Sequence, residues 1–77
     1  MEGDLQRRFG RNLRAYREAQ GLSQEAFADA LGVHRTYMGG VERGERNLTL
    51  RSVERLAARI GVEPMVLLDE VDGVRPQ

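Results

Sequence analysis

The sequence contains no cysteine and no lysine, and only two tyrosines and two phenylalanines represent the aromatic residues. Without cysteine, neither a disulfide nor a zinc–thiolate site can stabilise the fold. No apolar run approaches the roughly 20 residues that a membrane span requires, and we expect no signal peptide before the domain. We therefore expect a cytoplasmic protein that has no membrane partner.

The residues needed for catalysis are equally scarce. The chain has one histidine, His34, and no glycine loop of the kind that cradles phosphates. These residues supply no set of nucleophile, base and orienting group. His34 has no second histidine and no cysteine with which to bind a metal. We expect no enzymatic activity, no metal, no cofactor and no small-molecule ligand.

The formal net charge is zero, but the charges are unevenly distributed. Residues 1–60 carry eleven arginines and eight acidic residues, a surplus of three positive charges. Residues 61–77 carry one arginine and four acidic residues, a surplus of three negative charges. This pattern fits a body with one face that binds a polyanion. The exclusive use of arginine suits bidentate contacts to phosphate and guanine, although a GC-rich genome would produce the same bias.

Helical periodicity and helix-end signals cover nearly the whole chain. Leu5, Phe9, Leu13 and Tyr16 recur at helical spacing and predict the buried face of a first helix. Ser23 and Thr49 suit helix starts and Pro64 a first helical position, while glycines at 21, 32, 44 and 61 suit helix ends. The expected helices span about 4–20, 24–31, 35–43, 50–60 and 64–70. We predict an all-α domain over residues 1–72, followed by a frayed tail over 73–77.

Two short helices joined by a tight glycine turn form the central motif, residues 24–43. Ala28 is small where the two helices must cross closely, and Gly32 can take the positive φ that the turn needs. The five positions that bury one helix on the other are all apolar: Phe27, Leu31, Val33, Met38 and Val41. The alternative is an ordinary helical hairpin with a stripe of core residues. Such a hairpin does not require a small residue, a glycine and five apolar residues at these seven positions.

The stretch LSQEAFADALGVHRTYMGGVERG resembles the helix-turn-helix of the Xre family, which includes the lambda-type phage repressors and Cro. The resemblance covers about residues 5–68. The segment HRTYMGGVERGERNLTL is most similar to the controller proteins of restriction–modification systems. The resemblance implies a five-helix, lambda-repressor-like fold and a dimeric regulator that binds double-stranded DNA through the major groove.

The resemblance also assigns DNA contacts to individual positions at the helix starts. Gln24 matches a residue that binds phosphate, and a solvated residue at a helix start is the alternative. Arg35 and Thr36 match positions that read base edges, and Arg35 can grip guanine with two hydrogen bonds or contact only a phosphate. Tyr37 either faces the same groove or packs beside Met38. His34 either caps the helix or touches a phosphate.

Further positions follow from the same resemblance. Arg17 and Glu42 match a structural ion pair between the first helix and the end of the third. Arg43, Arg46 and Asn47 lie in a loop expected beside the DNA backbone, where Arg46 is the best candidate for a deeper contact; a solvated charged loop is the alternative.

Gly39 and Gly40 are unusual within a helix. They indicate either a close approach to DNA or drift at exposed positions, and they cannot read bases.

A single small module contacts few bases, so we expect a two-fold dimer with recognition helices about 34 Å apart. The run Met65, Val66, Leu67 and Leu68 is too apolar to be left exposed. Part of the run must close the core, and the remainder is the candidate dimer interface. Exposed acids at Glu45 and Glu54 are candidates for a contact with RNA polymerase.

We interpret the chain as a sequence-specific transcriptional regulator that binds palindromic operator half-sites as a homodimer. Its narrower interpretation is the autoregulatory controller of a restriction–modification operon. One alternative is a general phage- or antitoxin-type Xre repressor. A second, of another class, is a protein-interaction module that kept the fold and lost DNA binding.

Overall fold

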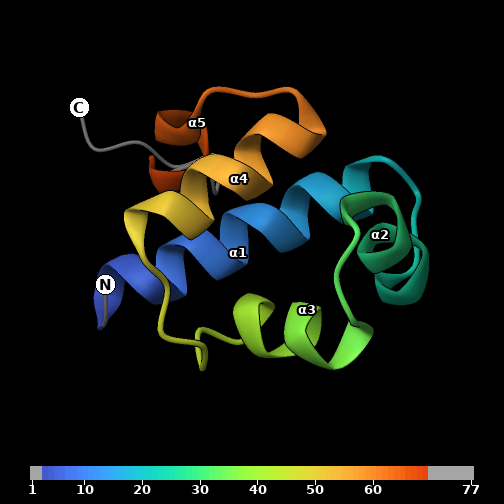
Figure 1. Ribbon diagram of the computed structural model, residues 1–77, viewed down its shortest axis with the longest axis horizontal. Helices are drawn as coiled ribbons and strands as arrows, with labels where there is room; N and C mark the ends of the chain where they lie inside the picture. The colour runs from blue at the N-terminus through green and yellow to red at the C-terminus, as the bar shows by residue number, and fades with distance from the viewer. Residues whose placement is uncertain (1–2, 70–77) are drawn as a thin grey trace.

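The computed structural model describes residues 3–69, and each regular element among them is an α-helix (Figure 1). The helices are α1 (Asp4–Ala19), α2 (Gln24–Leu31), α3 (Arg35–Glu42), α4 (Leu50–Ile60) and α5 (Pro64–Leu68). The predicted all-α fold with five helices is confirmed, and the bounds agree to within two residues. The boundary at residue 72 and the tail over 73–77 lie outside the described residues. No helix between residues 3 and 69 is long and apolar enough to cross a membrane.

The helix ends follow the local chemistry of the sequence. The Ser23 hydroxyl accepts a hydrogen bond from the Ala26 backbone N–H, and the Thr49 hydroxyl accepts one from that of Ser52. Both are N-caps that satisfy amide groups left without a partner in the first helical turn. Gly32 and Gly61 end α2 and α4 in the left-handed conformation, with φ of 73° and 80°. These signals fix where the chain turns.

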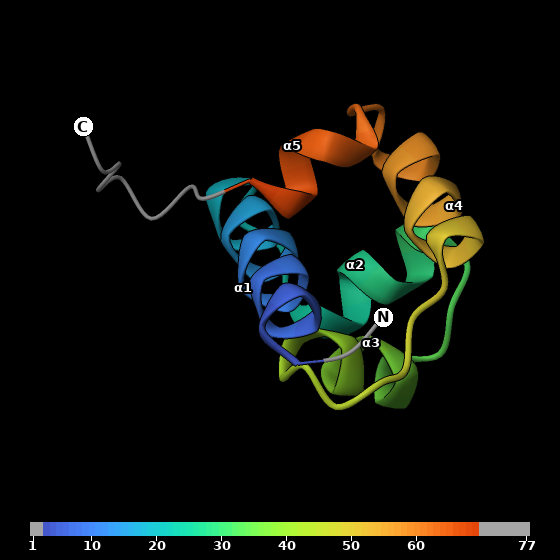
Figure 2. The same ribbon diagram turned by 90° about the vertical axis from the view of Figure 1, so that its left-hand side faces the viewer.

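The helices surround one core (Figures 1 and 2). Helix α1 packs against α3 and α5, and α4 packs against α2 and α5. In both views α3 lies along the lower edge of the molecule and α5 along the upper edge. One face of α3 is therefore free of other helices, and α5 lies on the opposite side of the domain.

The core confirms most of the predicted apolar positions and corrects one. Its buried members include Phe9, Leu13, Phe27, Leu31, Met38 and Val41. Leu5, predicted to lie on the buried face of the first helix, is instead 40% exposed. Its neighbour Gln6 is buried in the first two turns of α1. The first turn of α1 faces a loop whose polar backbone groups need hydrogen-bond partners, which a leucine cannot supply.

Helix α1 crosses α3 at Gly10, where the two backbones come unusually close. A Cβ atom added at Gly10 would lie 2.7 Å from the Glu42 carbonyl oxygen and nearer still to that of Val41. Any larger residue would push α1 away from the end of α3. This crossing therefore fixes the position of α3 relative to the rest of the domain.

Candidate nucleic-acid interface

Helices α2 and α3 meet through a three-residue turn, Gly32–His34, as the sequence predicted. Ala28 is buried where the helices approach, and the Val33 backbone N–H donates to its carbonyl oxygen at 3.0 Å. The Nδ1 atom of His34 accepts a hydrogen bond from the Thr36 backbone N–H at 3.0 Å, which makes His34 the N-cap of α3. Arg59 of α4 secures the unit by donating to the Leu31 carbonyl oxygen at the end of α2, at 2.7 Å.

The start of α3 presents polar side chains to solvent. Arg35 and Thr36 are both exposed. An Arg35 guanidinium nitrogen lies 3.8 Å from a carboxylate oxygen of Glu25, and both side chains are about two-thirds exposed. A pair this exposed contributes at most about 1 kcal/mol and is readily exchanged for another partner. Arg35 is therefore available to an incoming ligand.

An open depression of about 320 Å³ lies between the start of α2 and the outer face of α3. Five residues line it: Gln24, Arg35, Thr36, Gly39 and Arg43. Four of them were predicted to contact DNA, and the fold brings them together from two helices and the residue that follows α3. The two arginines make the depression a natural seat for an anionic group such as a phosphate.

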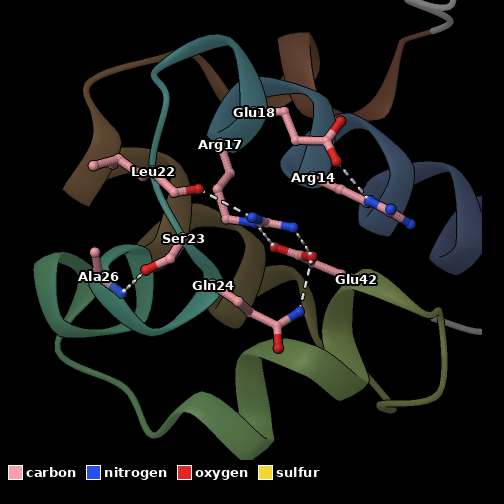
Figure 3. Close-up of polar contacts among 8 residues, drawn as sticks. All are labelled: Arg14, Arg17, Glu18, Leu22, Ser23, Gln24, Ala26 and Glu42. Carbon is pink, nitrogen blue, oxygen red and sulfur yellow. Dashed lines mark hydrogen bonds and ion pairs between the residues drawn. The ribbon is translucent and has the colours of Figure 1, made fainter.

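The predicted ion pair between Arg17 and Glu42 is present and largely shielded from water. Two parallel hydrogen bonds of 2.7 and 3.0 Å join the guanidinium to the carboxylate, and the side chains are only 12% and 2% exposed. The hydrogen bonds to Glu42 raise the pKa of Arg17, outweighing the opposing effect of burial. Arg17 also donates to the Leu22 carbonyl oxygen, so the pair fastens α1 to the α1–α2 connection and to the end of α3 (Figure 3).

Gln24 extends this pair toward the depression. Its amide nitrogen donates to the Glu42 carboxylate at 3.1 Å, and its side chain is half-buried (Figure 3). Gln24 was expected to be either a phosphate ligand or a solvated residue; the structure gives it a structural contact with Glu42, and the phosphate contact stays a prediction. One N–H of the amide and its oxygen remain for a ligand.

The loop after α3 is held by Gln6 of α1. The Gln6 amide donates to the Gly44 carbonyl oxygen at 2.9 Å and accepts from the Leu48 backbone N–H at 3.4 Å. Between these anchors, Arg46 and Asn47 are exposed. Arg43 lies before the first anchor and pairs with Glu45 at 3.0 Å on the surface. The loop is therefore fixed at both ends while its polar side chains face outward.

Of the two roles that the sequence left open for Tyr37, the structure shows packing, and a contact in the DNA groove stays a prediction. Its ring packs against the core from a half-buried position. The guanidinium carbon of Arg46 lies 5.2 Å from the ring centroid, a cation–π arrangement. Beside it, a second depression of about 380 Å³ places Ser52 and Arg55 of α4 near His34 and Tyr37. Ser52 and Arg55 could not be singled out from the sequence, because their proximity to α3 depends on the packing of α4.

Gly39 and Gly40 correct a further expectation. Both are buried, so the reading of drift at exposed positions is wrong. The side chains of Gln24 and Arg43 cover Gly39, and the side chain of Arg46 covers Gly40. The glycines therefore underlie three of the residues predicted to bind DNA.

The apolar run in α5 divides between the core and the surface. Leu67 is only 2% exposed within the single chain, so it must be removed from the predicted dimer interface and assigned to the core. Leu68 is half-buried against the same core, whereas Met65 and Val66 are 70% and 50% exposed. The buried amide of Asn12 donates to the Leu67 carbonyl oxygen at 2.8 Å and holds α5 on α1. Asn12 was missed because a buried asparagine has no distinctive spacing in a helix.

Helix α3 is capped, begins with an exposed arginine and threonine, and is joined to the supporting helix α2 by a glycine turn. This arrangement defines a helix-turn-helix DNA-binding domain of the lambda-repressor-like type. Residues 8–71 match the family described as "Helix-turn-helix domain", and the chain belongs to that family.

The chain is also similar to named control proteins. It is 43% identical over 65 residues to control protein C.SmaI of Serratia marcescens, covering 84% of this chain and 77% of that protein. It is 37% identical over 70 residues to control protein C.BamHI of Bacillus amyloliquefaciens, covering 90% and 86%. The solved restriction-modification controller protein C.AhdI from Aeromonas hydrophila is 48% identical, with a TM-score of 0.69 over 79% of this chain and 92% of that one. The chain is thus a DNA-binding transcriptional regulator of the helix-turn-helix class, a family whose members are not enzymes, and it is similar to restriction–modification controllers.

Proposed function

We propose that the chain binds a palindromic operator as a homodimer and controls the genes of a restriction–modification operon, its own gene included. Helix α3 lies along the lower edge of the domain (Figure 1). The observation that supports base reading is that Arg35 and Thr36 are exposed at the start of α3. The cationic depression beside them supports a phosphate contact that sets the register of α3 in the major groove. The names of the relatives support the choice of operon.

Selection from a library of random duplexes tests this function directly. We expect a two-fold symmetric motif whose half-sites are about one helical turn apart. A titration with salt on the selected duplex should then give a steep fall in affinity, because phosphate contacts release counterions. Weak binding that is blind to sequence would instead favour a protein-interaction module with a helix-turn-helix fold. Genes for a methyltransferase and an endonuclease next to this one would distinguish a controller from a general repressor.

Arg35 and Arg43 are expected to differ in what they contribute. Arg35→Ala should weaken binding to the selected motif by about 1–3 kcal/mol and relax the preference at one base pair per half-site. Arg43→Ala should weaken binding to all sequences alike and reduce the salt slope by about one per protomer. Affinities on the motif and on single-base variants at several salt concentrations measure both effects. Equal losses on every sequence for Arg35→Ala would reduce Arg35 to a phosphate contact.

The dimer interface is proposed to centre on Met65 and Val66. Val66 lines an apolar groove of about 230 Å³ between α1 and α5 together with Ala15 and Tyr16, and Met65 precedes it in the chain as an exposed apolar side chain. Because α5 lies on the side of the domain opposite α3, a partner can cover this face without covering α3 (Figures 1 and 2). Both recognition helices of such a dimer remain free for DNA.

Met65→Asp should convert the dimer into a monomer, because the carboxylate would be buried without a partner at the interface. Sedimentation at high micromolar concentration measures the change, and affinity for the two-fold motif should fall with it. Leu50→Asp is a matched control, since Leu50 is also strongly exposed, at 68%, but belongs to α4 and not to α5. It should leave the oligomeric state unchanged. A wild-type protein that sediments as a monomer would contradict the proposed dimer.

Regulation in this scheme depends on concentration rather than on a ligand. Dimerisation is second order in protein, so operator occupancy rises steeply as the regulator accumulates.

Contact with RNA polymerase is proposed to involve Glu54, which is exposed on α4, rather than Glu45. Glu45 is paired with Arg43 beside the proposed DNA surface.

A further inference from the structure

The side chain of Arg46 runs directly over the backbone of α3 at Gly40. A Cβ atom added at Gly40 would lie 3.0 Å from Cγ, 3.2 Å from Nε and 3.6 Å from Cδ of Arg46. The nearest of these separations is shorter than carbon atoms normally adopt in contact. A methyl group at residue 40 would therefore crowd the path that Arg46 follows and force its side chain to shift.

This path ends on Tyr37, one helical turn before Gly40. Positions three apart lie on the same face of a helix, so a side chain that passes over Gly40 reaches Tyr37. The guanidinium of Arg46 stands 5.2 Å from the centroid of the Tyr37 ring, and the ring also packs against the core. Arg46 comes from the loop and Tyr37 from the recognition helix, yet they occupy one continuous surface.

We propose that Gly40 is a positioning residue for DNA recognition: by lacking a Cβ atom, it lets Arg46 cross α3 and stack on Tyr37, so that the two side chains meet DNA as one group. This inference rests on the proposed function in that Tyr37 and Arg46 face the operator. It assigns to Gly40 a role in affinity and specificity, although a glycine makes no contact through a side chain.

Stability alone would favour alanine at this position. Glycine within a helix is less favourable than alanine by about 1 kcal/mol, and Gly40 does not have a positive φ. Each of the nearest atoms that a methyl group would meet belongs to the flexible side chain of Arg46. The fold can therefore accept alanine, while the position of Arg46 cannot remain the same.

The test is a double-mutant cycle with Gly40→Ala, Arg46→Ala and the double variant, measured on the duplex recovered by selection. We expect Gly40→Ala to weaken binding by about 2- to 5-fold, the equivalent of one exposed cation–π contact. In the Arg46→Ala background the same change should have almost no effect. Thermal melting should show Gly40→Ala to be at least as stable as the wild type, which separates positioning from folding.

Gly39→Ala is the matched control within the same helix. Its added methyl group would meet Gln24 and Arg43, not Arg46, so its effect on binding should be the same with and without the Arg46→Ala change. Gly40→Ala overturns the proposal if it leaves binding unchanged, or if it weakens binding equally in both backgrounds. A selection that recovers no motif would instead contradict the sequence-specific function. The cycle is then measured on a random duplex, where the same coupling is required.

Discussion

Replacing Arg17 with alanine is expected to lower the free energy of unfolding by about 3–5 kcal/mol. The side chain of Glu42 is 2% exposed. Without Arg17, its carboxylate would keep only the hydrogen bond from the Gln24 amide. A domain of this length has a total stability of about 4–12 kcal/mol, so the variant would be largely unfolded when heated modestly. Thermal melting followed by circular dichroism measures the loss, and DNA binding should fall in parallel.

Arg14→Ala is the matched control, because Arg14 lies on the same helix and pairs with Glu18 at 3.1 Å (Figure 3). Both partners are more than half exposed, and such a pair contributes about 0.3–0.5 kcal/mol. A variant with methionine at both 17 and 42 should recover most of the stability lost by Arg17→Ala, since it leaves no buried charge. If Arg17→Ala melts at the wild-type temperature, the Arg17–Glu42 pair does not stabilise the packing of α1 against α3 as its geometry indicates.

The parts of the fold that could be predicted from the sequence are those set by neighbouring residues. Ser23 and Thr49 cap helices through hydrogen bonds to amides three residues away. Gly32 takes a φ of 73° because the turn demands it locally. Such signals repeat at fixed spacing, so they also placed Arg35 and Thr36 at the exposed start of α3.

Contacts between distant segments leave no comparable pattern. Gln6 is bonded to residues 38 and 42 positions away, and Asn12 to one that is 55 positions away. Both stand in a helix where a polar residue is normally solvated. The Arg17–Glu42 pair was predicted only through the family resemblance, since nothing in the spacing of two charges 25 residues apart indicates a contact.

The recognition surface shows the same division. Single residues of the surface could be named from the motif, but their grouping could not. Arg46 meets Tyr37 because Gln6 holds the intervening loop and Gly40 leaves room. Leu67 and Met65 are both apolar and lie two residues apart in one short helix. Only the packing of α5 on α1 shows that Leu67 belongs to the core and Met65 to the surface. Periodicity over five residues is too short to separate them.

Gly10→Ala is expected to destabilise the domain by about 3 kcal/mol, the upper range for overpacking, even though alanine is the better helix former. The added methyl group would lie 2.7 Å from the carbonyl oxygen and 2.9 Å from the carbonyl carbon of Glu42, and closer still to the Val41 oxygen. These are backbone atoms, so α1 and α3 must separate. The melting temperature should fall by about 12–24 °C for a domain of this size.

Gly40→Ala supplies the comparison, because it makes the same chemical change inside a helix where only a flexible side chain must move. Its melting temperature should stay the same or rise, and the difference between the two variants isolates the backbone contact from helix propensity. A separation of α1 from α3 also stretches the Arg17–Glu42 hydrogen bonds, since Glu42 is the residue that Gly10 approaches. Gly10→Ala and Arg17→Ala should therefore be less than additive when combined. If Gly10→Ala melts at or above the wild-type temperature, the close crossing of α1 over α3 is not what positions the recognition helix.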